Sequence, residues 1–133
     1  PVKVIAPDLY RSVDLQQEWG RVFKRPPRIA QAGVAALKGV REDAALLVRF
    51  EQEHAKALKW CQEHPEPCGA MAARHVEMLT PEGVAGALAA TRDTMAWVGA
   101  AQARPDLEFF YQQLLERQPG LVGGKLPDAG FYG

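Results

Sequence analysis

The sequence has no net charge and no long apolar run, and these two absences exclude several classes of protein. Its 16 Lys and Arg residues are balanced by 16 Asp and Glu residues in a chain of 133. A balanced chain has no global electrostatic attraction for nucleic acid or for an acidic membrane. No apolar stretch approaches the roughly 20 residues that a helix needs to cross a bilayer. We therefore expect a folded domain that has no nucleic acid as a partner.

The sequence also lacks the common catalytic motifs. The run Gly123-Gly124-Lys125 is not a phosphate-binding loop, because Pro119 stands at the upstream glycine position and Leu126 stands where Ser or Thr is required. The metalloprotease pattern HExxH and the hydrolase pattern GxSxG do not occur. These absences predict a protein that is not an enzyme, with no catalytic residues and no cofactor.

Cysteine and histidine are scarce, and most of them lie in one short stretch. The residues concerned are Cys61, His64, Cys68 and His75. A zinc site is disfavoured, because C-x2-H-x3-C-x6-H is not a standard spacing and two prolines interrupt it. Cys61 and Cys68 could instead form a disulfide across a helical turn, which would stabilise the fold by about 2.5 kcal/mol. Two buried thiols are the other reading, so no metal is expected and the state of the cysteines stays open.

The clearest pattern present is an amphipathic helix from Asp43 to His64. Its apolar residues recur at spacings of three and four: Leu47, Phe50, His54, Ala57, Leu58 and Cys61. Asp43 is suited to cap the free N–H groups of the first turn. Pro65 disfavours helical geometry at His64, so the helix should end there, and Pro67 suits the first turn of a second helix.

Shorter patterns predict a mixture of helices and strands in the rest of the chain. Helices are expected from Ser12 or Asp14 to Trp19 with Gly20 as the stop, over residues 81–90 behind a Thr80 cap, and over residues 107–118. Strands are expected at residues 2–6, 29–37 and 95–98. The basic residues between 21 and 28 are interpreted as a solvated turn.

The expected fold class is therefore α/β and helix-rich, with two or three short strands. So few strands form a poor independent sheet. We expect them to pair with further chain or with a second copy of this chain, and we expect this sequence to be part of a longer protein.

Two segments resemble a family of transport receptors. The first is LLVRFEQEHAKALKWCQEHPE, residues 46–66, followed by the alanine-rich residues 70–74. The second is GGKLPDAGFYG, residues 123–133. Both are similar to the C-terminal region of the substrate-binding proteins of nitrate-, sulfonate- and taurine-type ABC transporters.

This resemblance implies the C-terminal portion of a two-lobed periplasmic-binding-protein fold that closes on its ligand. Residues 1–133 would form a single partial domain, with residues 1–23 ending one lobe, residues 24–28 crossing the hinge and residues 29–133 forming a helix-rich return lobe. The ligand would be a small molecule contacted by Gln31, Ala32 and Gly33.

The same resemblance implies the partners and the compartment. They are an ABC permease in the membrane and either a missing N-terminal half of the receptor or a second copy of the chain. The compartment would be the periplasm, or the cell surface as an exported lipoprotein.

Two other functions remain open from the sequence. The chain could be a small helical module that dimerises or binds a partner protein through an apolar face. It could also be part of an enzyme whose active residues lie in further sequence.

Overall fold

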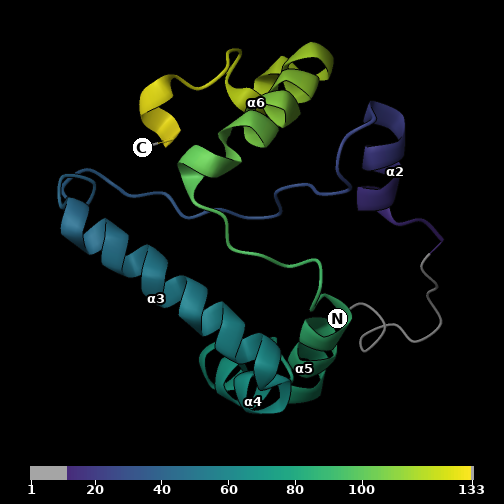
Figure 1. Cartoon of the computed structure of the whole chain (residues 1–133), viewed down its shortest axis with the longest axis vertical. Helices are drawn as coiled ribbons and strands as arrows, with labels where there is room; N and C mark the ends of the chain where they lie inside the picture. Colours follow the sequence, from purple (N-terminus) through teal and green to yellow (C-terminus); the bar gives the residue numbers. More distant parts are fainter. Residues whose placement is uncertain (1–11, 133) are drawn as a thin grey trace. The chain divides into compact units, whose positions relative to one another are not determined.

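The computed structural model describes residues 12–132, and within them the only regular secondary structure is helical (Figure 1). The α-helices are α2 (Leu15–Phe23), α3 (Ala44–Glu63), α4 (Pro65–His75), α5 (Pro81–Ala90) and α6 (Ala100–Arg117). Two 3-10 turns, η1 (Pro119–Val122) and η2 (Ala129–Tyr132), follow them. Residues 12–132 contain no strand, so the expected α/β class is wrong and the described chain is all-α.

Two of the expected strands are irregular connections instead. Residues 29–37 lie on the connection from α2 to α3 and have no regular structure. All of them except Ile29 are exposed, and a turn follows at Lys38. Residues 95–98 lead from α5 to α6 in the same way. A strand needs a neighbour to bond its backbone, and the described chain offers these runs none. The third expected strand, residues 2–6, lies outside the described residues.

The described residues divide into two compact units. One contains residues 12–13 and Ala36–Trp97, and we call it the α3–α5 unit. The other contains Asp14–Ala35 and residues 98–132, and we call it the α2–α6 unit. Residues 24–28, expected as a hinge crossing, belong with α2 in this second unit. The assignment of these parts to receptor lobes stays a prediction.

In the α2–α6 unit, helix α2 runs further than the sequence predicts. The Asp14 side chain caps it by accepting from the backbone N–H groups of Gln16 and Gln17. The helix does not stop at Gly20 but at Lys24, which has a left-handed backbone with φ 52°. Gly20 is instead where the following connector folds back, since a Cβ there would lie 2.9 Å from the carbonyl oxygen of Arg25. The glycine therefore permits a close approach rather than ending the helix.

In the α3–α5 unit, the predicted helix boundaries are confirmed. Asp43 caps α3 by accepting from the Leu46 N–H at 2.9 Å, and the helix ends before Pro65. Thr80 caps α5 by accepting from the Gly83 N–H at 3.1 Å. Capping and proline effects act within one helical turn, which is why the sequence alone locates these ends.

Helix α6 and the tail after it both differ from expectation. Helix α6 starts at Ala100, seven residues before the predicted Leu107, and carries Pro105 inside it. The alanine-rich first turns have no apolar periodicity, so the pattern missed them. The expected irregular tail is two short 3-10 turns, and Tyr132 in the second is one of only two hydrophobic residues buried among residues 12–132, the other being Leu88 in α5.

Candidate functional site

The residues predicted to contact a ligand lie in the connection between α2 and α3. Gln31, Ala32 and Gly33 are all exposed. The Gln31 side-chain amide donates to the carbonyl oxygen of Ile29 at 3.3 Å, and a Cβ on Gly33 would meet nothing within 4 Å. The three residues are neighbours along an open segment, and no side chain from another element closes over them within residues 12–132. Their ligand role stays a prediction.

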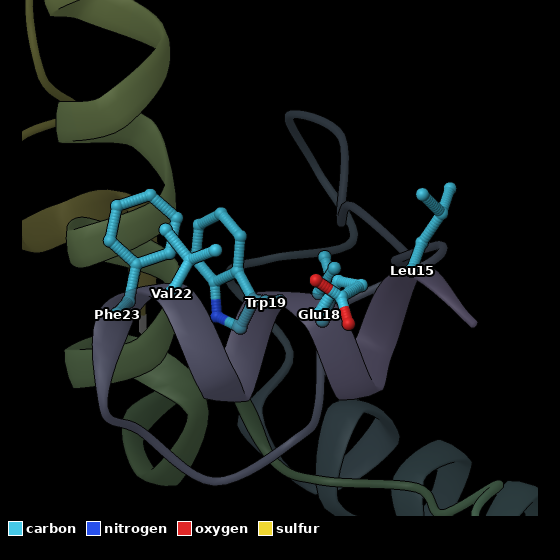
Figure 2. A pocket seen from close by; sticks show the side chains of 6 residues that line it. Leu15, Glu18, Trp19, Val22 and Phe23 are labelled. Carbon is cyan, nitrogen blue, oxygen red and sulfur yellow. The ribbon is translucent and has the colours of Figure 1, made fainter. Parts of the chain in front are cut away.

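A shallow, open groove lies beside α2 (Figure 2). Its volume is about 310 Å³, and its lining is apolar except for one carboxylate. The lining residues are Leu15, Glu18, Trp19, Val22, Phe23 and Ile29. Ile29 is fixed there because its backbone N–H donates to the Gln16 side-chain oxygen at 3.4 Å. Sequence reasoning missed this groove, although the apolar side of α2 indicated it.

The polar rim of this groove is a single ion pair. Glu18 accepts from the Arg21 guanidinium at 2.6 Å and 2.9 Å. The hydrogen bond from Arg21 lowers the pKa of the Glu18 carboxyl, which therefore stays ionised. A groove with one paired carboxylate at its edge suits an apolar side chain better than a polar small molecule.

Behind the groove, an aromatic cluster joins α2 to α6. The ring of Trp19 lies 4.4 Å from that of Phe23 and 5.7 Å from those of Phe109 and Phe110, measured between centroids. Figure 2 shows Trp19 and Phe23 on the side of α2 that faces α6. These half-buried residues pack α2 against α6, so their aromatic character serves packing.

Two arginines of the connector clamp one carboxylate of α6. Asp106 accepts from Arg25 and from Arg28, each at 3.0 Å, and the Arg25 guanidinium lies 4.2 Å above the Phe109 ring. Burial raises the pKa of the Asp106 carboxyl, but the hydrogen bonds from the two arginines outweigh it and the pKa lies below its ordinary value. Arg25 and Arg28 therefore hold the connector onto α6.

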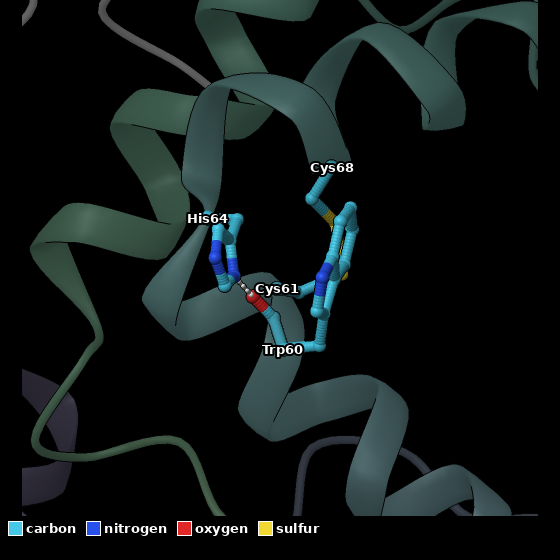
Figure 3. The surroundings of a disulfide bond; sticks show 4 residues. All are labelled: Trp60, Cys61, His64 and Cys68. Atoms are coloured by element: carbon cyan, nitrogen blue, oxygen red, sulfur yellow. Dashed lines mark hydrogen bonds between the residues drawn. A yellow bond between two sulfur atoms is a disulfide. The ribbon is translucent and has the colours of Figure 1, made fainter.

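The corner between α3 and α4 contains a disulfide (Figure 3). Cys61 and Cys68 are joined with an S–S distance of 2.10 Å and a Cα–Cα distance of 5.2 Å. Trp60 directly precedes Cys61 in the chain, and its ring is stacked on that of His64 with 5.2 Å between centroids. The His64 Nδ1 atom lies 3.0 Å from the Trp60 carbonyl oxygen. The bonded sulfurs are not available as thiolate ligands for a metal.

Two absences among the described residues bear on other kinds of site. Within residues 12–132, no group of three or more His, Cys, Asp or Glu side chains is placed to hold a metal ion. Among the helices of the same residues, none is long and apolar enough to span a membrane.

Comparisons with known proteins do not identify a family. Neither the protein-family models, nor the curated protein sequences, nor the solved structures give a significant match to this chain.

Proposed function

We propose that the chain is a non-catalytic helical part of a receptor that captures a small solute for an ABC importer. The observation that carries the proposal is the division into two compact units between which the chain passes three times, at residues 13–14, 35–36 and 97–98. A receptor that closes on its ligand needs two bodies joined by chain crossings that can bend.

The disulfide supports the same proposal from a different direction. Such bonds form and persist in oxidising compartments, such as the bacterial periplasm, and are rare in the cytosol. A Cys61–Cys68 bond is therefore in keeping with an exported protein, either periplasmic or attached to the membrane as a lipoprotein.

The proposed mechanism is closure without chemistry. A solute that binds the closed form of such a receptor better than the open form shifts the population toward the closed form. Gln31 offers a donor and an acceptor to such a solute, and Gly33 allows it to approach the backbone closely. The rest of the chamber would come from further chain or from a second copy, and the closed form would then dock on the membrane permease.

Two measurements test this proposal together. We expect the coding sequence upstream of Pro1 to contain an export signal and a strand-rich α/β region. We also expect one class of small solute to raise the melting temperature of the full gene product with saturation, equivalent to about 2.7 kcal/mol at a concentration of 100 Kd. A start codon directly before Pro1, with no stabilisation by any solute of a broad panel, would contradict it.

A matched pair of variants makes the solute measurement specific. Gln31→Ala should weaken solute binding and leave the melting temperature of the solute-free protein unchanged, because the side chain is exposed. Gln52→Ala, on the polar side of α3, removes the same chemical group elsewhere and should change neither quantity.

A second candidate function rests on the apolar side of α3. Leu46 is 47% exposed and Phe50 is 42% exposed, although both lie on the apolar face of this amphipathic helix. Trp97 covers part of that face, with its ring 4.2 Å from the His54 ring. Exposed apolar residues that share one face are typical of a surface that binds another protein. We propose dimerisation or partner binding through this face as the alternative function.

Light scattering distinguishes this alternative. If α3 mediates self-association, the mass should rise with concentration, and Leu46→Glu should abolish the rise because it buries a charge in the contact. Gln52→Glu adds the same charge on the opposite side of the helix and should leave the rise intact. A monomer at every concentration would argue against self-association through α3.

A further inference from the structure

The Cys61–Cys68 bond joins two helix ends of opposite polarity. Cys61 lies in the last turn of α3 and Cys68 in the first turn of α4. Both residues are only half-buried, so a small thiol can reach the bond. Figure 3 shows the bond bridging the corner where the chain turns at His64. The covalent link therefore spans the joint between the two helices.

Few other contacts hold α3 against the rest of its unit. None of its 20 residues is buried. The Gln62 amide donates to the carbonyl oxygens of Arg92 at 3.3 Å and Met95 at 2.8 Å, and Trp97 contacts the rings of Phe50 and His54. These are half-exposed contacts at single points along a long helix.

The neighbouring pair α4 and α5 is packed much more closely. Gly69 is buried at the crossing, where a Cβ would overlap the carbonyl oxygen of Pro81. Leu88 of α5 is also buried. The α4–α5 hairpin is thus a body with a core, whereas α3 is an arm attached to it at one end.

We propose that the Cys61–Cys68 disulfide is a redox-responsive latch that fixes the direction of α3 relative to the α4–α5 hairpin. With the bond closed, the joint at His64 is held from both sides. With the bond open, α3 keeps the Gln62 and Trp97 contacts and its few contacts with α4 and α5, so it samples other directions and its last turns open more often. The latch would be open in a reducing compartment and closed in an oxidising one. It does not depend on solute binding and goes beyond the proposed receptor function.

The opening reaction is thiol–disulfide exchange with a dithiol. A thiolate of the dithiol attacks the Cys61 sulfur, the Cys61–Cys68 bond breaks, and Cys68 leaves as a thiolate. Cys68 is the better leaving group because the positive end of α4 favours negative charge there, whereas Cys61 lies at the negative end of α3. The second thiol of the reductant then displaces Cys61. Two electrons reduce the protein disulfide to two thiols while the dithiol becomes a cyclic disulfide.

Trp60 gives this latch a spectroscopic signature. Its indole stacks on His64 at the same corner as the bond (Figure 3). A disulfide quenches the fluorescence of a nearby indole, and Trp60 is the chain neighbour of Cys61, so opening the bond should raise the emission of Trp60. A Trp60→Phe variant should lose this increase while the latch itself continues to open.

The deciding experiment is amide hydrogen exchange of the full protein, followed by mass spectrometry, with and without dithiothreitol. Intact mass first establishes that the bond is closed in air and gains two hydrogens on reduction. We expect reduction to accelerate exchange in the last turns of α3, which the bond holds, at least about tenfold and to leave α5 within about twofold, since α5 does not depend on the bond. The double variant Cys61→Ser with Cys68→Ser should behave like the reduced protein without any reductant.

Two results would overturn the proposal. Equal exchange in the last turns of α3 before and after reduction would show that the disulfide does not control the joint between α3 and α4. Two free thiols after exposure to air would mean that the latch does not close. Because reduction of the unmodified protein gives the same readout, failure of the serine variant to fold leaves the test intact.

Discussion

At the scale of single residues, two glycines determine how closely elements approach. Gly69 lets α4 cross against the start of α5, and Gly20 lets the connector after α2 fold back on the helix. Each position lies inside a helix, where glycine is otherwise unfavourable by about 1 kcal/mol relative to alanine. At both positions the space beside the backbone is occupied by another part of the chain, which explains the choice of residue.

We expect Gly69→Ala to destabilise the α3–α5 unit by about 1–3 kcal/mol, because the added methyl group overlaps the Pro81 carbonyl and forces α4 and α5 apart. Urea denaturation monitored by circular dichroism measures the change. Gly86→Ala is the matched control, since it lies in α5 with nothing within 4 Å of the new Cβ. It should be stabilising by about 0.5–1 kcal/mol. Equal effects of the two substitutions would contradict the close crossing.

The ionisation of Asp106 makes the stability of the α2–α6 unit depend on pH. Its pKa is lower in the folded protein than its ordinary value of 3.8, because hydrogen bonds from Arg25 and Arg28 outweigh burial. The stabilisation is therefore fully present above pH 3.8 and is lost as the pH falls through the lowered folded value. We expect Asp106→Asn to reduce the melting temperature at neutral pH and to have little effect at the most acidic pH.

Melting curves followed between pH 7 and pH 2 test this expectation. Asp93→Asn, at an exposed turn after α5, is a control that removes one carboxylate from the other unit. A constant difference between Asp106→Asn and the unmodified protein over the whole pH range would show that the carboxylate is not the titrating group.

At the scale of elements, helix ends are set by local chemistry. Asp43 and Thr80 each satisfy a backbone N–H at a helix start. Pro65 ends α3 and begins α4, because it cannot donate a hydrogen bond but fits the first helical position. Since these effects need no distant partner, the boundaries in the α3–α5 unit follow directly from the sequence.

We expect Asp43→Ala to destabilise the first turn of α3 by about 1 kcal/mol, because the Leu46 N–H loses its acceptor. Amide exchange at residues 44–47 should become faster, and the C-terminal end of α3, which the disulfide holds, should be unchanged. Glu42→Ala removes the adjacent acid, which makes no capping bond to α3, and is the control. An identical response to both substitutions would argue that charge rather than capping sets this helix end.

At the scale of the whole molecule, the described residues bury little apolar surface. Among residues 12–132 only Leu88 and Tyr132 are buried hydrophobic residues. Large side chains such as Met78, at 84% exposure, and Leu37, at 75%, lie in water instead. Burial of apolar surface is the main favourable term in folding. A chain that buries so little of it should have a small free energy of unfolding.

We therefore expect the isolated chain to bind a hydrophobic dye such as ANS and to unfold over a broad temperature range. Calorimetry should give a calorimetric enthalpy that differs from the van't Hoff value, because no single core makes the transition all-or-none. A physiological partner should sharpen the transition and displace the dye by covering the exposed side chains. A sharp two-state transition without dye binding would contradict this expectation.

The sequence could predict part of the candidate site and not the rest. It located both cysteines at a helical corner but left open whether they are bonded, since bonding depends on how α3 and α4 meet. Gln31, Ala32 and Gly33 were chosen through a resemblance, and the structure places them on an open connection. The groove at Trp19 and Ile29 was missed, because it requires the connector to fold back on α2.

The sequence by itself determined where the main helices of the α3–α5 unit begin and end, because caps, prolines and apolar spacing act over a few residues. Only the tertiary structure decided that residues 29–37 and 95–98 are not strands, since pairing needs a neighbour that no local pattern specifies. It likewise decided the close crossing at Gly69 and the clamp at Asp106. Contacts between residues far apart in the chain depend on the conformation of all the residues between them, and no single segment of the sequence specifies that conformation.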